Sequence, residues 1–128
     1  MQPEHAKSIF IVDDDELFTD MLANYLAKNP LYTIRTFNTG EACLPELQQH
    51  PDIIILDYSL NSIFKDAANG LQILEAIRKL DKHVHVIMLS SQERYGIALQ
   101  TIAKGAEQYV VKGTEAFKEV ADIIRQLN

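Results

Sequence analysis

The chain has 128 residues, of which 47% are hydrophobic and 23% charged, a balance that is ordinary for a globular domain and excludes collagen-like, disordered and disulfide-rich classes. Its 18 acidic and 12 basic residues give a formal net charge of −6, which argues against direct binding to a nucleic-acid backbone. The longest uninterrupted apolar runs have four residues, whereas a membrane-spanning helix needs about 20, and residues 1–7 lack the apolar core of a signal peptide.

The organisation along the chain predicts a single domain over residues 1–128. No linker, internal repeat or low-complexity segment interrupts it. The single cysteine, Cys43, has no second cysteine with which to form an intrachain disulfide. This favours a reducing compartment and a cytoplasmic location. A lone cysteine is more often a small core residue than a reactive thiol.

Short apolar runs and helical periods alternate along the chain. Residues 9–12 form an apolar run typical of a strand, and apolar residues then recur at helical spacing until the Asn-Pro pair at positions 29–30 ends the helix. Residues 32–37 alternate between polar and apolar types, as a half-exposed strand does. The helix that starts near Gly40 is expected to be short or kinked, because Pro45 lies inside it.

The second half of the chain repeats the alternation. Residues 53–56 form an apolar run that is typical of a strand covered on both faces. After a polar stretch over residues 58–69, a helix follows Gly70, and a fourth strand is predicted over residues 84–89. Gly105 is predicted to end the next helix, since glycine favours the left-handed conformation found at helix C-termini. The last two elements are a short strand over residues 109–111 and an amphipathic helix through residues 117–127.

Strict alternation of five strands with five helices is typical of an α/β domain whose parallel sheet has helices on both faces. Right-handed crossover connections leave few topologies for such a chain. The apolar strands at residues 9–12 and 53–56 are expected in the middle of the sheet, and the alternating strand at residues 32–37, which carries Arg35, at its edge. The pattern therefore predicts a flavodoxin-like, doubly wound, five-stranded parallel sheet with strand order 2-1-3-4-5.

Chemically active side chains follow four of the predicted strands. Asp13 and Asp14 end the first strand, and Asp57 ends the third. Ser90 ends the fourth strand and Lys112 ends the fifth. Ligands of open α/β sheets bind at the carboxyl ends of the strands, near the point where the strand order reverses. We therefore expect three carboxylates, a hydroxyl and an ammonium to converge at one edge of the sheet.

This set of groups favours phosphoryl chemistry. Three neighbouring carboxylates repel one another, and a hard divalent cation relieves that repulsion. Mg²⁺ suits such a site because it prefers oxygen ligands and keeps several waters, whose positions phosphate oxygens can take. Lys112 offers a second positive charge to a phosphoryl group, and Ser90 offers a hydrogen-bond donor. Because a carboxylate is a competent nucleophile, the residues indicate a Mg²⁺-dependent site that forms an aspartyl phosphate.

Four ordered motifs resemble the receiver domain of two-component response regulators, the CheY-like family. They are Ile-Phe-Ile-Val-Asp-Asp at residues 9–14, Ile-Ile-Ile-Leu-Asp at 53–57, Val-Ile-Met-Leu-Ser-Ser at 86–91 and Tyr-Val-Val-Lys at 109–112. The resemblance covers essentially the whole chain. It implies a signalling switch rather than an enzyme, a domain that catalyses only its own phosphorylation and dephosphorylation with Mg²⁺.

The resemblance also implies a role for each matching residue of the site. Asp57 corresponds to the phosphoacceptor, and Lys112 to the lysine that contacts the phosphoryl group. Asp14 corresponds to the acid that binds the metal directly, and Asp13 to its neighbour, which usually binds through water. The backbone carbonyl of Ser59 corresponds to the third protein ligand, so the implied metal set is Asp13, Asp14, Asp57 and Ser59.

The output of the switch is implied by further matches. The hydroxyl of Ser90 corresponds to the group that turns towards the phosphoryl group, and Tyr109 to the aromatic residue that moves between exposed and buried positions. The output face of the family is formed by the fourth helix, the fifth strand and the fifth helix. Ser59 and Gln92 occupy the positions that tune the lifetime of the phosphoryl group, and neither is charged. A measurable but not extreme rate of self-dephosphorylation is therefore expected.

The implied partners are other proteins. The phosphoryl donor is a histidine kinase or a histidine phosphotransfer protein, and the output passes to an output domain or effector protein. Phosphorylation-linked dimers are common in the family, which makes a second copy of the chain another implied partner. Neither a nucleic acid nor a membrane is expected to bind this domain.

Two segments depart from the usual pattern of the family. From Asp57 to Gly70 the chain spans 13 positions, several more than usual, and the extra length carries Ile63 and Phe64. Such apolar residues are unusual in a solvated loop, and we expect the loop to fold back on its own domain. Gly113 stands where the family usually has a proline, often after a cis peptide bond. Because a cis bond before another residue type costs about 2.5–4 kcal/mol, the bond before Gly113 is either trans or strained.

Two alternatives to an active receiver stay open. An apolar strand followed by Asp-x-Asp is also the first motif of haloacid-dehalogenase-type phosphatases, with Ser90 and Lys112 as later motifs. In that class Asp13 is the nucleophile and Asp15 the general acid. This alternative leaves Asp57 without a role, and the late acidic pair that it requires is missing. The other alternative is a degenerate receiver that binds partners without phosphorylation, which the long loop and the missing proline keep open.

Overall fold

The computed structural model describes residues 6–61, 65–91 and 95–127. The strands are β1 (Lys7–Val12), β2 (Tyr32–Phe37), β3 (Ile53–Asp57), β4 (His85–Ser90) and β5 (Gln108–Val111). The helices are α1 (Glu16–Leu26), α2 (Gly40–Cys43), the 3₁₀ helix η1 (Leu44–Gln49), α3 (Gly70–Leu80), α4 (Tyr95–Ala103) and α5 (Ala116–Gln126). All strand pairs are parallel and the order is β2-β1-β3-β4-β5, which confirms the predicted topology.

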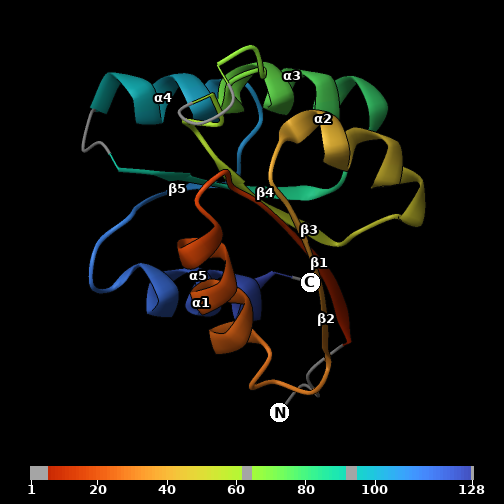
Figure 1. Ribbon diagram of the computed structural model, residues 1–128, viewed down its shortest axis with the longest axis vertical. Coiled ribbons are helices and arrows are strands. Elements are labelled where there is room, and N and C mark those ends of the chain that lie inside the picture. The colour runs from red at the N-terminus through yellow and green to blue at the C-terminus, as the bar shows by residue number, and fades with distance from the viewer. Residues whose placement is uncertain (1–5, 62–64, 92–94, 128) are drawn as a thin grey trace.

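Helices cover both faces of the sheet and enclose two hydrophobic clusters. In Figure 1, α1 and α5 lie on one side of the sheet, and α2, α3 and α4 on the other. On the α1–α5 face, Ile11 and Ile55 pack with Leu22 and Ile124. The opposite cluster is built from strand residues that point the other way and from α2, η1 and α3; its members include Phe10, Leu56, Cys43, Leu47, Ile73 and Ile77.

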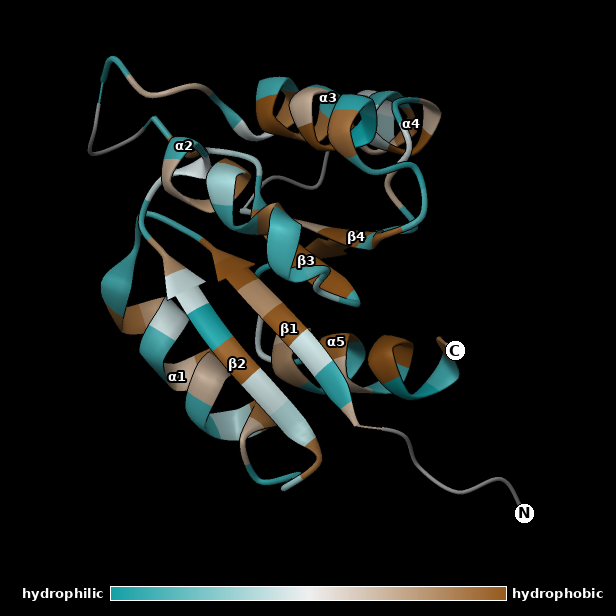
Figure 2. Cartoon of the chain, turned by 90° about the vertical axis from the view of Figure 1, so that its right-hand side faces the viewer, coloured by the Kyte–Doolittle hydropathy of each residue, from teal (hydrophilic) through white to brown (hydrophobic). Residues whose placement is uncertain are grey.

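The burial of each strand matches its predicted place. Every residue of β3 is buried, because helices cover the sheet on both sides of it. In β2, half-buried and exposed residues alternate over residues 32–35, Thr36 is exposed and Phe37 is buried, and Figure 2 shows a teal band beside a brown one on this strand. β2 has β1 as its neighbour on one side only, which confirms it as an edge strand.

Pro45 shapes the segment after β2. The α-helix α2 has only four residues, and the chain then continues as the 3₁₀ helix η1 with Pro45 in its first turn. A proline lacks the backbone N–H that a longer α-helix would need at this place, so the predicted shortening is confirmed. Cys43, at the end of α2, is fully buried, and burial raises the pKa of its thiol to about 12. It is therefore a core residue, as predicted.

Helix α4 packs shallowly against the domain, although most of its residues are apolar. Of its nine residues, Thr101 is the buried one, whereas Tyr95, Leu99 and Ile102 are 80%, 54% and 43% exposed. These three residues recur at helical spacing on the outer side of the helix. The end of α4 does follow the prediction: Gly105 has φ of 111°, and the N–H groups of residues 105 and 106 donate to the carbonyls of residues 102 and 101, as in a Schellman motif. No helix within the described part of the chain is long and apolar enough to cross a membrane.

Candidate functional site

The carboxyl ends of the strands place the predicted residues at one edge of the sheet. β1 and β3 pair in register up to the residues that precede Asp13 and Asp57, which brings these two aspartates side by side. On the other side of β3, β4 ends at Ser90, and the N–H of Lys112 donates to the carbonyl of Ser90 at 2.8 Å. Topology, not a local motif, therefore brings these residues together.

Asp13, Asp14 and Asp57 form a buried acidic cluster. One carboxylate oxygen of each lies within 4.8 Å of the others, and the three residues are 0%, 5% and 2% exposed. Lys112 Nζ lies 2.8 Å from Asp13 Oδ2 and 3.3 Å from Asp57 Oδ1. The Lys112 ammonium thus contacts two of the three carboxylates, and the close approach of carboxylates in a buried site favours a proton or a cation there.

The pKa values of Asp57 and Lys112 reflect their burial and their close neighbours. Burial, together with the charge of Asp13, raises the pKa of Asp57 from 3.8 to about 7, although the Lys112 ammonium acts in the opposite direction. Burial by itself lowers the pKa of Lys112, but the hydrogen bond to Asp13 and the charges of both aspartates outweigh it and raise that pKa above 10.5. At neutral pH the lysine is charged, and the Asp57 carboxyl is poised between its two forms.

The donor set fits a hard divalent cation. Asp13 Oδ1 accepts a hydrogen bond from the N–H of Asp15 at 3.0 Å. Asp13 Oδ2 is buried and contacts the Lys112 ammonium at 2.8 Å. This buried oxygen, with the carboxylates of Asp14 and Asp57, matches the all-oxygen ligands that Mg²⁺ prefers.

The other predicted site residues lie around this cluster. Ser59 is half-buried, two positions after Asp57, and its carbonyl stays a predicted ligand. Ser90 is 1% exposed at the end of β4. Tyr109 lies on β5 opposite Met88 and packs, half-buried, against the cluster under α3. Gln92, predicted to flank the site, lies outside the described residues.

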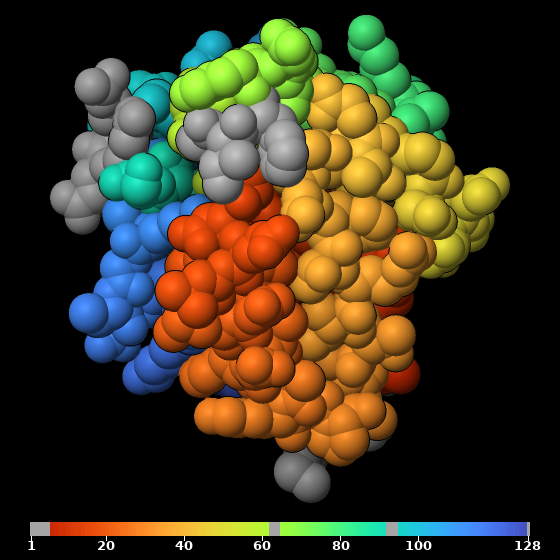
Figure 3. Space-filling view, in the orientation of Figure 1, coloured from red at the N-terminus to blue at the C-terminus, as the bar shows by residue number. Residues whose placement is uncertain are grey.

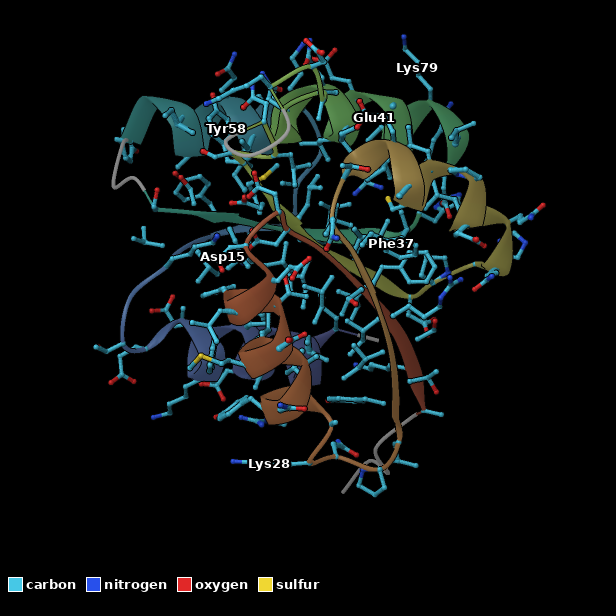
Figure 4. All side chains as sticks on the ribbon, in the orientation of Figure 1. Asp15, Lys28, Phe37, Glu41, Tyr58 and Lys79 are labelled. Carbon is cyan, nitrogen blue, oxygen red and sulfur yellow. The ribbon has the colours of Figure 1, made fainter. Side chains whose placement is uncertain are left out.

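The ends of the long segment after β3 are anchored to the domain. The N–H of Gly70 donates to the carbonyl of Tyr58 at 2.8 Å, and Asn69 and Gln72 form a capping box at the start of α3. The N–H of Ala68 donates to Glu41 Oε2 on α2 at 2.8 Å. The light-green surface after position 64 accordingly borders the gold surface of α2 (Figure 3), and Glu41 and Tyr58 both lie towards this end of the molecule (Figure 4). Ile63 and Phe64, for which a folded-back loop is predicted, lie outside the described residues.

Gly70 is a glycine because the backbone of β3 passes too close for any side chain. A Cβ at this position would lie 2.3 Å from the carbonyl oxygen of Asp57 and 2.6 Å from Tyr58 Cα. We expect Gly70→Ala to lower the free energy of unfolding by about 1–3 kcal/mol, as overpacking does, and to displace the end of β3. Urea unfolding measures the change.

Gly96→Ala is the matched control for that prediction. Gly96 is the second residue of α4, and a Cβ there would meet nothing within 4 Å. Alanine favours a helix over glycine by about 0.5–1 kcal/mol, so this variant is expected to be as stable as the wild type or more so. Equal destabilisation by both substitutions would contradict the close approach at Gly70.

For the peptide bond after Lys112, which is predicted to be either trans or strained, the structure shows the trans form. No peptide bond in the described parts of the chain is cis, so the bond between Lys112 and Gly113 is trans. Gly113 is exposed, its φ is not positive, and a Cβ there would meet nothing within 4 Å. The departure from the usual proline therefore leaves the backbone after the lysine unstrained and without close packing.

Two contacts near the site carry no signal in the sequence. In the sequence Phe18 is an ordinary apolar position of α1, but in the structure its ring lies under the ammonium of Lys112. Glu41 reads as a surface acid in the first turn of α2, yet it accepts the hydrogen bond from Ala68. Both contacts join residues that are far apart in the chain, so only the folded structure shows them. Asp15, by contrast, is the N-cap of α1, as an acid at a helix start is expected to be.

The strand order and the acidic site with its lysine define a CheY-like α/β domain. A sequence model of the response regulator receiver domain matches residues 9–125. The chain therefore belongs to the response regulator receiver domain family, which confirms the resemblance seen in its motifs.

Individual relatives agree with this family. The chain is 25% identical over 124 residues to the chemotaxis protein CheY of Bacillus subtilis (strain 168), a match that covers 96% of this chain and 99% of CheY. It is 27% identical over 112 residues to the transcriptional regulatory protein MalR of the same organism, covering 84% of this chain but only 45% of MalR. The chain thus spans nearly all of one relative and less than half of the other.

Solved structures share the fold. The receiver domain of NtrX from Brucella abortus superposes with a TM-score of 0.80 at 24% identity, over 94% of this chain and 99% of that one. The response regulator domain of Thermotoga maritima CheB gives a TM-score of 0.82 at 21% identity, over 96% of both chains. At these identities the likeness concerns the flavodoxin-like fold alone.

Proposed function

We propose that this chain is a phosphorylatable signalling switch that accepts a phosphoryl group on Asp57 from a histidine kinase or a histidine phosphotransfer protein. The observation that carries the proposal is the surroundings of the Asp57 carboxylate. It is buried at the end of the central strand β3, 3.3 Å from the Lys112 ammonium and beside two further carboxylates. A nucleophile next to a fixed positive charge is what phosphoryl transfer requires.

The transfer exchanges one phosphorus bond for another. A carboxylate oxygen of Asp57 attacks the phosphorus of a phosphohistidine and forms a P–O bond. The P–N bond breaks, and the imidazole nitrogen leaves with the bonding electron pair. In dephosphorylation, water attacks the phosphorus, the P–O bond to Asp57 breaks, and inorganic phosphate and the carboxylate are released. Lys112 is proposed to neutralise charge on the phosphoryl oxygens, and Ser90 to donate a hydrogen bond to one of them.

Asp13, Asp14 and Asp57, with the carbonyl of Ser59, are the residues proposed to hold Mg²⁺. When bound, the ion supplies positive charge to the phosphoryl oxygens and relieves the repulsion among the carboxylates. The support for this assignment is that Asp13, Asp14 and Asp57 are buried with carboxylate oxygens within 4.8 Å of one another, an arrangement that suits a hard divalent cation.

The proposed output is a change in the surface formed by α4, β5 and α5. Ser90 ends β4, and Tyr109 lies one strand away on β5, so a movement of the serine towards the phosphoryl group is expected to alter the packing beside the tyrosine. α4 has few buried residues and exposes Tyr95, Leu99 and Ile102, which makes it the helix that moves at the smallest loss of core contacts. An effector protein, an output domain or a second copy of the chain is proposed to read this surface.

The hydrolase alternative finds less support in the geometry. As a nucleophile, Asp13 would have the Lys112 ammonium 2.8 Å away, but the proposed general acid, Asp15, accepts the N–H of Phe18 as the N-cap of α1. Asp15 is thus engaged with its own helix, and this alternative leaves the buried Asp57 beside Lys112 without a role. We therefore place the phosphoryl group on Asp57 in a single receiver domain, and we propose that it acts in the cytoplasm.

The proposal is tested with the wild-type protein, Mg²⁺ and a small acyl-phosphate donor. We expect intact-mass spectra to show one added phosphoryl group, absent when EDTA is present, and peptide mapping to place it on Asp57. A known active receiver is labelled in parallel as the positive control. A folded protein with no adduct would favour a receiver that binds partners without phosphorylation. An adduct on Asp13 with turnover of a generic phosphomonoester would favour the hydrolase.

A further inference from the structure

The ammonium of Lys112 contacts an aromatic ring in addition to two carboxylates. Its Nζ lies 4.5 Å from the centroid of the Phe18 ring, within the range of a cation–π interaction. The lysine side chain is 17% exposed, so little water competes for the ammonium. Phe18 belongs to α1 and Lys112 follows β5, so this contact joins the helix after the first strand to the end of the last one.

The backbone before Lys112 is held by hydrogen bonds, whereas the backbone after it is exposed and loosely packed. Before it, β5 pairs with β4, and the N–H of Lys112 donates to the carbonyl of Ser90. After it, Gly113 is exposed and has open space where a side chain would be. The direction of the long lysine side chain therefore depends on what its ammonium touches.

The reaction changes the carboxylate contacts but leaves the ring unchanged. Phosphorylation converts the Asp57 carboxylate into an acyl phosphate, so the 3.3 Å ion pair does not survive in its present form. Asp13, the other partner at 2.8 Å, also belongs to the acidic cluster that fits a cation. The attraction of Lys112 to the face of Phe18 is the same before and after the transfer.

Phe18 is itself held in place from two sides. Its N–H donates to Asp15 Oδ1 at 3.1 Å, which fixes the first turn of α1. Its ring meets Phe117 of α5 edge to face, with centroids 5.4 Å apart and planes at 64°. Tyr25, two turns further along α1, packs against the same Phe117 ring at 5.6 Å. The face presented to Lys112 therefore belongs to a packed aromatic cluster between two helices.

We infer that Phe18 is a positioning residue for phosphoryl transfer: its ring holds the Lys112 ammonium at the site when the carboxylate contacts of the lysine change. The inference rests on the proposed function of Asp57 as phosphoacceptor. Losing the ring should leave the lysine present but less often in position. A slower transfer is therefore expected, with the same phosphorylated product.

The test compares variants that keep or lose the aromatic face. Phe18→Leu retains an apolar side chain without a ring, and Phe18→Tyr retains the ring. We expect the initial rate with a small acyl-phosphate donor to fall about fivefold in Phe18→Leu, which corresponds to about 1 kcal/mol at tenfold per 1.36 kcal/mol. Phe18→Tyr is expected to restore the rate to near that of the wild type.

Tyr25→Leu is the matched control. Tyr25 belongs to the same aromatic cluster and has its own lysine, Lys28, 4.9 Å from the ring centroid. Lys28 lies at the opposite end of α1 from Asp15 (Figure 4). We expect this variant to be destabilised like Phe18→Leu and to be phosphorylated at the wild-type rate. An equal loss of rate in Phe18→Leu and Tyr25→Leu would overturn the inference, since general packing would then explain the result. A loss of rate in Phe18→Tyr as large as that in Phe18→Leu would also overturn it.

NMR spectra of the wild-type protein test the contact between Lys112 and Phe18 without phosphorylation and without any variant. Protons near Nζ of Lys112 lie over an aromatic face, so their NMR signals are expected upfield of those of the exposed lysines. Lys112 signals at ordinary lysine positions would overturn the inference even if Asp57 is phosphorylated. If the wild type shows the upfield shift but accepts no phosphoryl group, the contact stands and the proposed function fails.

Discussion

Asp57→Asn is expected to reduce phosphorylation by a small acyl-phosphate donor to the background of an EDTA control. The amide that replaces the carboxylate is not a competent nucleophile, and no other carboxylate of the cluster takes the central place at the end of β3. The shape of the side chain is kept, so the domain is expected to fold. Intact-mass spectra of the wild type and the variant, labelled in parallel, measure the difference.

Two further substitutions make that result specific. Asp15→Asn changes an acid two residues from the cluster, but Asp15 is exposed and acts as the N-cap of α1, a role that asparagine fills equally well. It should be labelled like the wild type. Asp13→Asn identifies the nucleophile: a hydrolase would lose its adduct in Asp13→Asn and keep it in Asp57→Asn. That pattern would refute Asp57 as the phosphoacceptor.

The strand order was predictable because burial leaves a direct trace in the sequence. The unbroken apolar runs of β1 and β3 require cover on both faces, and the alternation in β2 requires an edge. With the order known, the carboxyl ends of the strands bring Asp13, Asp57 and Lys112 together without any local motif. The short helix at Pro45 was predictable as well, since the missing N–H and the ring of a proline limit a helix in any context.

The contacts that refine the site were not predictable in the same way. Phe18 beside Lys112 and Glu41 beside Ala68 each depend on the angle at which a helix crosses the sheet. Helical periodicity gives the face on which a residue lies but not what that face meets. For the same reason, the exposure of the apolar residues of α4 is seen only in the folded structure.

The long segment after β3 shows how a change of spacing leaves the site intact. The chain needs 13 positions to pass from Asp57 to Gly70, yet the glycine still lies against the Asp57 carbonyl and its N–H still binds the Tyr58 carbonyl. The start of α3 is fixed by this close approach and by its capping box, both independent of the length between the two ends. Extra residues in a surface loop are tolerated under these conditions, because the entropy of loop closure grows only slowly with length.

The burial of Asp57 beside Asp13 predicts that the metal-free domain becomes less stable as the pH rises. In the unfolded chain Asp57 has its ordinary pKa of 3.8, whereas burial and the charge of Asp13 raise it to about 7 in the folded domain. Between these values the folded state holds a proton that the unfolded state has lost. The stability due to this group is therefore fully present below pH 3.8 and is lost as the pH rises through about 7. The loss amounts to about 4 kcal/mol between the two pKa values.

Urea unfolding in EDTA, from about pH 5 to pH 8, measures this loss where most of it is expected. The raised pKa of Lys112 does not alter the sign, because its contribution is lost only above pH 10.5. Asp57→Asn isolates the carboxyl: the variant should lose much less stability over this range and should be more stable than the wild type at the alkaline end. Mg²⁺ should stabilise the wild type most at the alkaline end, where the carboxylates are charged. Parallel curves for the two proteins would mean that Asp57 keeps an ordinary pKa and that its neighbours already balance its charge.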